Sequence, residues 1–160
     1  MDAGWNFVVD DRIVLHNCRM AHSGRLASLA GAVGLAAIAG AHLVWATGSS
    51  WPYSDRTELA DNIAGRADMP GPRACVTVAA ALAAGAVVVA VPGRRGSLVQ
   101  LAQLGLTAVL FTRGVAGVTR RTRLLVSWDP SDLFVEKDRR LYGPACLVLA
   151  ALSALSLRNR

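Results

Sequence analysis

The sequence predicts an all-α, polytopic integral membrane protein: a four-transmembrane-helix bundle with two long loops on one face. Of the 160 residues, 53% are hydrophobic and only 18% are charged, whereas about a quarter are charged in an ordinary soluble chain. The mean hydropathy is positive, +0.38, and the apolar residues form four blocks instead of recurring at core periodicity. These blocks do not alternate polar and apolar residues as barrel strands do, so helices are the predicted spanning form.

The four predicted spans lie within a membrane domain at residues 26–157, between a polar N-terminal extension (1–25) and a short tail (158–160). The spans are residues 26–47, 75–91, 98–118 and 142–157. The first and third are long enough to cross a hydrocarbon core of about 30 Å, and the second is at the short end of the range. The fourth is short but continuous, and Leu141 or nearby loop residues could extend it. The extension lacks the apolar core and cleavage site of a signal peptide. Met20 offers a second translation start, so residues 1–19 are either a flexible extension or lie upstream of the true start.

Two long loops, residues 48–74 and 119–141, alternate with a tight turn at 92–97. The tight turn contains Pro, Gly and two Arg residues, a composition typical of short connections. Because the number of spans is even, both long loops lie on one side of the membrane and both termini lie on the other.

Two local patterns predict structure inside the long loops. Asp55 and Gly65 are placed to cap a short surface helix over residues 57–64. In the other long loop, residues 124–128 combine apolar side chains with Trp128. That composition favours a segment at the membrane interface with the tryptophan as its anchor.

Small residues recur at helical spacing in two of the spans. They are Ser28, Ala32, Ala36 and Gly40 in the first span and Ala81 and Gly85 in the second. Such ladders let helix backbones approach closely, which is a main source of helix association in lipid. The alternative is an alanine-rich composition that fills apolar space by default.

The charge distribution identifies the lipid bilayer as the main partner. The net charge is +6, but the basic residues lie between the apolar blocks, where loops meet anionic head groups. They form no stripe, so we predict no nucleic-acid partner.

The orientation in the membrane depends on the charges of the loops. Lys and Arg are almost equally divided between the two sides of the membrane. The tight basic turn favours both termini in the cytoplasm, in a multi-pass protein of the bacterial cytoplasmic membrane. A homo-oligomer or a membrane-protein partner stays open.

Polar groups gather near the membrane face that holds the long loops. The candidate site comprises His42, Trp45, Arg113, Glu136, Asp138, Tyr142 and Cys146. At helical spacing, three spans each carry a stripe with polar members. These stripes contain Leu35, Ile38, His42 and Trp45; Gln103, Leu106, Leu110, Arg113 and Gly117; and Tyr142, Cys146, Leu149, Ser153 and Ser156. If the stripes face inward, their polar groups meet.

Arg113 is the strongest signal, because a guanidinium in hydrocarbon costs at least about 2.5–3.5 kcal/mol and usually faces a partner or a cavity. It pairs with a loop acid such as Glu136 or Asp138, holds an anionic ligand, or extends to the head groups from its position near the helix end. His42 is either a proton carrier or ligand, or a histidine that is hydrogen-bonded across helices.

Neither a metal nor a cofactor is predicted. The histidines have no partner at metal-ligand spacing, and the sequence has no C-x-x-C motif. Cys75 and Cys146 both lie near the long-loop face, where they form a disulfide if that face is periplasmic or remain free apolar thiols. Trp45, Trp51 and Tyr142 fit an aromatic belt at the interface better than a binding box.

Three segments of the chain are similar to one family. They are His42-Leu-Val-Trp45-Ala-Thr-Gly48, Phe111-Thr-Arg113-Gly114, and Phe134 followed by Asp138-Arg-Arg-Leu-Tyr142-Gly-Pro144-Ala-Cys146-Leu. In order and spacing they resemble the bacterial membrane-protein family known as domain of unknown function 3995, from about Arg25 to the C-terminus. The resemblance implies a small four-span protein without established activity, substrate or cofactor. After Arg113 the chain departs from the usual pattern, with Gly-Val-Ala-Gly-Val-Thr-Arg-Arg where a more aromatic and acidic stretch is expected.

No catalytic motif accompanies these segments: the sequence has no nucleophile elbow, phosphate loop or paired intramembrane carboxylates. We therefore expect a non-enzymatic accessory or small-ligand-binding bundle, with a lipid-like or anionic small molecule as the candidate ligand. The alternative is a small membrane enzyme acting on a lipid or isoprenoid-like substrate. In that enzyme His42 and Asp138 would act as acid or base, and Arg113 would hold an anionic head. A proton-linked transporter is less favoured because the chain has no inverted repeats or broken helices.

Overall fold

The computed structural model describes residues 11–91 and 96–158, and every regular element within them is helical. The elements are α1 (Asp11–Ala46), α2 (Arg56–Ala64), α3 (Pro72–Ala90), α4 (Ser97–Val118), η1 (Thr122–Leu124), α5 (Asp132–Lys137), η2 (Asp138–Tyr142) and α6 (Gly143–Arg158). Four helical stretches are long and apolar enough to cross a membrane. They are Gly24–Ala46, Pro72–Ala90, Ser97–Val118 and Asp132–Leu157. The prediction of an all-α membrane protein with four spans is confirmed.

All four spanning helices begin earlier in the chain than expected, and the first and the fourth differ most. Helix α1 starts at Asp11, within the expected polar extension, because no proline or glycine interrupts residues 11–23. The fourth span is continuous from Asp132, where Ser131 caps the helix by accepting a hydrogen bond from the amide of Phe134. Residues 1–10, 92–95 and 159–160, which hold part of the predicted extension, turn and tail, lie outside the described residues.

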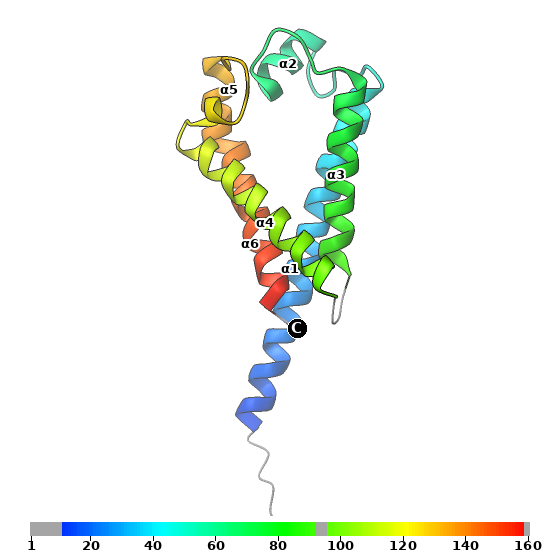
Figure 1. Cartoon of the computed structure of the whole chain (residues 1–160), viewed down its shortest axis with the longest axis vertical. Coiled ribbons are helices and arrows are strands. Elements are labelled where there is room, and N and C mark those ends of the chain that lie inside the picture. The colour runs from blue at the N-terminus through cyan, green and yellow to red at the C-terminus, as the bar shows by residue number, and fades with distance from the viewer. Residues whose placement is uncertain (1–10, 92–95, 159–160) are drawn as a thin grey trace, which may run out of the picture.

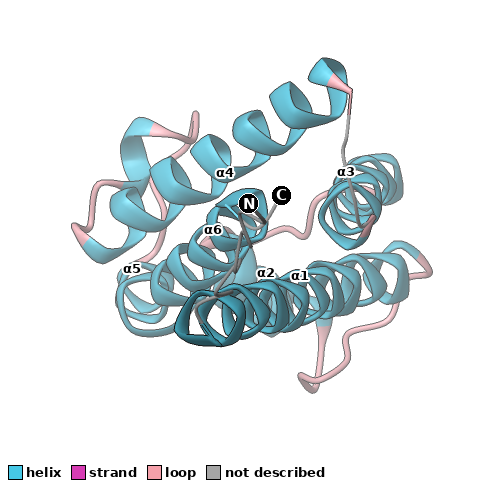
Figure 2. Cartoon of the chain, turned by 90° about the horizontal axis from the view of Figure 1, so that it is seen from below, coloured by secondary structure: helices cyan, strands magenta, loops and turns pink. Residues whose placement is uncertain are grey.

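The helices pack as two pairs, α1 with α3 and α4 with α6, and the pairs join through α1 and α6. Figure 1 shows the pairs close together near the end of α6 and farther apart toward α2 and α5, and Figure 2 views them end-on from below. The core where the pairs meet consists of Leu35, Ala86, Val89, Leu110, Leu149 and Ala150. The described start of α1 and the described end of α6 both lie at the opposite end of the structure from α2 and α5 (Figure 1).

The predicted ladder of small residues on α1 is correct only in its first half. The Ser28 hydroxyl donates to the carbonyl of Val89 on α3, and Ala32 packs against the core. Ala36 is exposed, and a Cβ added to Gly40 would meet nothing within 4 Å. Rows of residues spaced by four wind around a helix, so the row leaves the interface after about two turns.

Helix α2 confirms the short helix predicted inside the first long loop. Asp55 accepts hydrogen bonds from the amides of Thr57 and Glu58, both at 2.8 Å. Gly65 ends the helix at φ 65°, in the left-handed region that glycine adopts without strain. The capping residues in the sequence therefore predicted the first and last residues of α2 to within one position.

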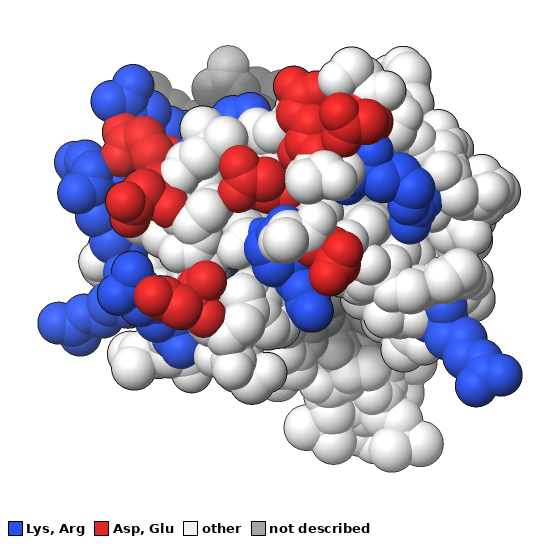
Figure 3. All heavy atoms as spheres, turned by 90° about the horizontal axis from the view of Figure 1, so that it is seen from above, with Lys and Arg blue, Asp and Glu red and all other residues white. Residues whose placement is uncertain are grey.

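The two long loops pack against each other and form one structure at the end of the bundle, which we call the cap. The cap comprises residues 47–71 and 119–137. The Ser131 amide donates to the carbonyl of Gly65 (3.0 Å), and the indole of Trp128 donates to the carbonyl of Ala64 (3.0 Å). Phe134 lies over Gly65, where an added Cβ would be 2.8 Å from its side chain. Trp128, expected as a membrane anchor, thus connects the two loops. Figure 3 shows charges of both signs interspersed over this face.

Candidate functional site

The centre of the candidate site is an ion pair between Arg113 on α4 and Asp138 at the start of η2. The guanidinium lies 2.9 Å from Oδ2 and 2.8 Å from Oδ1 of the carboxylate. Asp138 is completely buried, while the side chain of Arg113 keeps 30% of its exposure. The buried hydroxyl of Thr122 also donates to Oδ2. Asp138 therefore joins α4, η1 and η2 through charge-assisted hydrogen bonds.

Glu136, the other predicted partner of Arg113, faces outward and pairs elsewhere. Its carboxylate lies 2.6 Å from the guanidinium of Arg120 and also contacts that of Arg140. The two acids are two positions apart on one helix, which places them about 200° apart around its axis. One acid can therefore face the bundle only if the other faces away from it.

Three glycines allow the carboxylate to reach α4. An added Cβ on Gly117 would lie 2.8 Å from Oδ1 of Asp138, and one on Gly114 would lie 2.7 Å from the side chain of Leu147. On the facing helix, a Cβ on Gly143 would lie 2.9 Å from the backbone nitrogen of Val118. Gly114 and Gly117, which follow Arg113 on α4, thus supply two of the three close-contact positions.

Element η2 is a π-helical turn, in which the amide of Gly143 donates to the carbonyl of Asp138. One turn holds an extra residue, so residues before and after it change their angular relation. Asp138, at the start of this turn, is paired with Arg113 on α4, and Tyr142, at its end, bonds to the first long loop.

Tyr142 and Lys137 connect the fourth span to α2. The hydroxyl of Tyr142 donates to the backbone carbonyl of Asn62 (3.0 Å), and Lys137 donates to the side-chain oxygen of the same residue. Lys137 also lies 3.3 Å from the hydroxyl of Tyr53. Asn62 is 5% exposed, so this is a buried polar connection between the two long loops.

We expect Tyr142→Phe to lower the free energy of unfolding by about 1 kcal/mol, the usual net value of one hydrogen bond. The measurement is the unfolding midpoint of the detergent-solubilised protein. Thr77→Val is the control, because Thr77 is exposed and bonds only to the carbonyl of Arg73 in its own helix. A Tyr142→Phe protein as stable as this control would mean that the bond to Asn62 does not hold the loops together.

His42 and Trp45 form a separate group on α1. Nδ1 of His42 lies 2.9 Å from the carbonyl of Ile38, and its ring centroid is 4.9 Å from that of Trp45. Trp45 is buried, and its indole donates to the carbonyl of Trp51 (2.8 Å). Within the described residues no hydrogen bond, ion pair or ring contact joins His42 to the Arg113–Asp138 pair.

The two cysteines lie on different helices, and Cys75 packs against Trp45 and Leu59. Cys146 is half-buried on α6, and Cys75 is buried at the start of α3; both thiols are free. The structure therefore brings together Arg113, Asp138 and, through η2, Tyr142. It leaves Glu136 on the outer surface and His42 on another helix pair.

A second polar cluster lies deeper in the bundle, on the stripes predicted for α4 and α6. The amide of Gln103, which is fully buried, donates to the carbonyl of Ser153 (2.9 Å) and to the hydroxyl of Ser156. Thr107 donates to the hydroxyl of Ser153 (2.8 Å). Such bonds hold helices together in lipid, where unpaired polar groups are costly. The inward stripes on these two helices are confirmed.

Sequence reasoning missed Thr122, whose hydroxyl is a second donor to Oδ2 of Asp138, beside Arg113. A single hydroxyl in a loop carries no periodic signal, so nothing in the sequence distinguished it. Among the described residues, no group of three His, Cys, Asp or Glu side chains is arranged to hold a metal ion.

Comparison with known proteins gives a family and no closer relative. The family described as "Protein of unknown function (DUF3995)" matches residues 35–153. No curated protein and no solved structure matches the chain. The matched region contains both sides of the Arg113–Asp138 pair and the three glycines around it. Because the match covers most of the chain, the protein belongs to the DUF3995 family of proteins of unknown function.

Proposed function

We propose that this protein is a non-enzymatic accessory or small-ligand-binding bundle of the bacterial cytoplasmic membrane, with both termini in the cytoplasm and the cap on the opposite side. The observation that carries the proposal is the burial of Asp138. Its carboxylate is completely enclosed and receives bonds from Arg113 and Thr122. The charge of Asp138, the most buried charged group of the candidate site, is therefore already neutralised by protein partners.

General acid–base catalysis needs a group within hydrogen-bond reach of a substrate proton. Asp138 offers no surface to a substrate. His42 is partly accessible, but its described contacts are with residues of its own helix. An acid, a base and an anion holder are thus not assembled at one place among the described residues, which favours a structural role for the ion pair.

The sharpest competing function is an enzyme acting on a lipid or isoprenoid-like substrate through His42. The test compares total lipid extracts, by mass spectrometry, from cells without the protein and from cells producing the wild type or His42→Gln. We expect equal accumulation of the two proteins and the same lipid profile in all cells. A lipid that appears with the wild type and disappears with His42→Gln, at equal protein levels, would contradict the proposal.

The proposed orientation is tested separately by cysteine labelling. Cys18 is near the N-terminus, and an impermeant thiol reagent applied to intact cells should leave it unlabelled. Cys75→Ser and Cys146→Ser variants remove the competing thiols. Labelling of Cys18 in intact cells would place the N-terminus outside and reverse the proposed orientation.

A further inference from the structure

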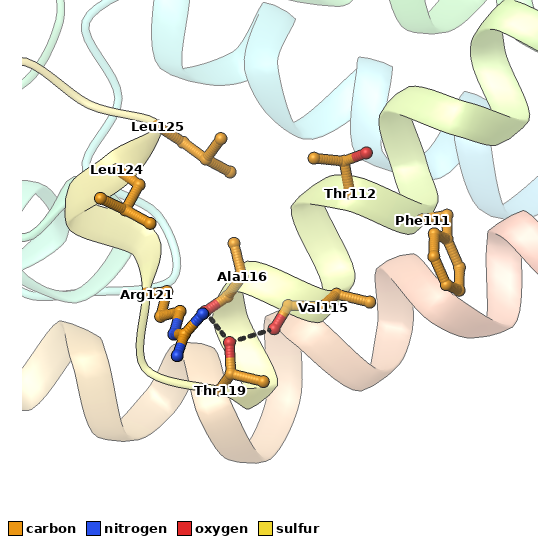
Figure 4. A pocket seen from close by; sticks show the side chains of 8 residues that line it. All are labelled: Phe111, Thr112, Val115, Ala116, Thr119, Arg121, Leu124 and Leu125. Atoms are coloured by element: carbon orange, nitrogen blue, oxygen red, sulfur yellow. Dashed lines mark hydrogen bonds between the residues drawn. The ribbon is translucent and has the colours of Figure 1, made fainter.

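A groove runs along the outside of the bundle between the second half of α4 and the loop that contains η1 (Figure 4). Its volume is about 310 Å³. Its lining includes Phe111, Val115, Ala116, Leu124 and Leu125, with Arg121 at one end. Phe111, Leu124 and Leu125 are 57%, 77% and 45% exposed. The groove is therefore open to its surroundings and mostly apolar.

Its position relative to the membrane gives the groove two chemical environments. Helix α4 ends at Val118, so Arg121 lies just beyond the span, at the level of head groups. Phe111 is seven residues before that end, which corresponds to about 10 Å along the helix axis. The apolar residues of the groove on α4 thus lie beside acyl chains, and the guanidinium lies beside head groups.

Arg121 is the cation of this loop that has no acidic partner. Arg120 is paired with Glu136 (2.6 Å) and Arg123 with Asp129 (2.9 Å). Among the described residues no ion pair includes Arg121, and its side chain is exposed. The groove therefore carries one uncompensated positive charge at its head-group end. A zwitterionic head group would bring its own cation close to this charge, whereas an anionic head group would not.

We propose that the groove binds one anionic glycerophospholipid, with the phosphate against Arg121 and an acyl chain along the apolar lining. This inference rests on the proposed ligand-binding function and names its ligand class. Arg and phosphate form charge-assisted hydrogen bonds, and anionic head groups attract basic residues next to a span. The apolar lining gives affinity for any acyl chain, and the guanidinium gives the preference for negative charge.

The test is native mass spectrometry of the delipidated full chain in detergent, titrated with dioleoyl phosphatidylglycerol or dioleoyl phosphatidylcholine. We expect one bound phosphatidylglycerol, with an affinity about tenfold above that of phosphatidylcholine. Arg121→Gln should remove this preference. Arg139→Gln is the matched control, because Arg139 is also exposed, has no ion pair among the described residues and lies outside the groove.

A second pair of variants tests the apolar part of the groove. Ala116→Leu fills the lining and should weaken binding of both lipids, whereas Ala108→Leu, on an exposed part of α4 outside the groove, should not. Equal affinities of the wild type for the two lipids would overturn the proposal, as would identical behaviour of Arg121→Gln and Arg139→Gln. Displacement of bound phosphatidylglycerol by inorganic phosphate alone would indicate a phosphate site and also overturn it.

The same experiment separates this inference from the proposed function. If the protein were an enzyme acting on this lipid, incubation would change the mass of the bound lipid; that result would end the non-enzymatic proposal and leave the lipid site intact. If no selective binding occurs and the lipid mass is unchanged, the site is wrong and the non-enzymatic proposal stands.

Discussion

Asp138→Ala is expected to lower the free energy of unfolding by about 3 kcal/mol, the largest loss for any single charged residue whose side chain the structure describes. Removing one partner of a buried pair leaves the other charge uncompensated, which costs about 3–5 kcal/mol. The lower end applies because the side chain of Arg113 keeps 30% of its exposure. The measurement is the midpoint of unfolding by added sodium dodecyl sulfate, together with the amount of protein that accumulates in the membrane.

Two further variants make this result specific. Glu136→Ala removes an acid two positions away that pairs with Arg120 and Arg140 at the surface, and we expect little change. Replacing both Arg113 and Asp138 with leucine should recover part of the lost stability, because no unpaired charge remains. If Asp138→Ala and Glu136→Ala were equally stable, the buried ion pair would not be the centre of the α4–α6 contact.

Gly143→Ala is expected to destabilise the protein by about 1–3 kcal/mol, the cost of overpacking a close contact. The added Cβ would lie 2.9 Å from both the nitrogen of Val118 and the carbonyl oxygen of Asp138. These are backbone atoms on both sides, so neither can move without displacing a helix. The separation of α4 from η2 would also lengthen the Arg113–Asp138 contact. The same unfolding titration measures the loss.

Gly105→Ala is the matched control for this substitution. Gly105 also lies within a span, but an added Cβ would meet nothing within 4 Å. Alanine has a higher helix propensity than glycine by about 1 kcal/mol, so this variant should be unchanged or more stable. A loss of similar size in both variants would mean that backbone effects, and not the close approach of α4 to η2, determine the response.

The four spans and the capped helix α2 were predictable because their causes are local in sequence. The length of a continuous apolar block shows whether a helix can cross the hydrocarbon core of a bilayer. Asp55 and Gly65 cap the two ends of one short helix. A loop acid as one of the possible partners of Arg113 also followed from the cost of its charge. Each of these inferences depends on one segment at a time.

The choice between two acids and the details of packing were less predictable because they depend on pairs of segments. Glu136 and Asp138 are nearly adjacent, and only the angle of the fourth helix, including the π-helical turn, determines which one faces Arg113. The second half of the ladder on α1 was wrong for the same reason, since Ala36 and Gly40 are small residues but lie at an angle that faces away from the interface. His42 and Arg113 both lie near the membrane face that holds the long loops, but they do not contact each other. The spacing of residues in the sequence does not predict whether two helices bring such residues into contact.

The distance in sequence between Arg113 and Asp138 has a consequence for how the protein is made. The two residues are 25 positions apart and lie on different spans, and α4 itself contains no carboxylate that could neutralise the guanidinium. Without the last span, the guanidinium would have to extend to water or head groups. Insertion of α4 with its charge neutralised therefore requires the last span, which favours entry of the second half of the chain as one hairpin.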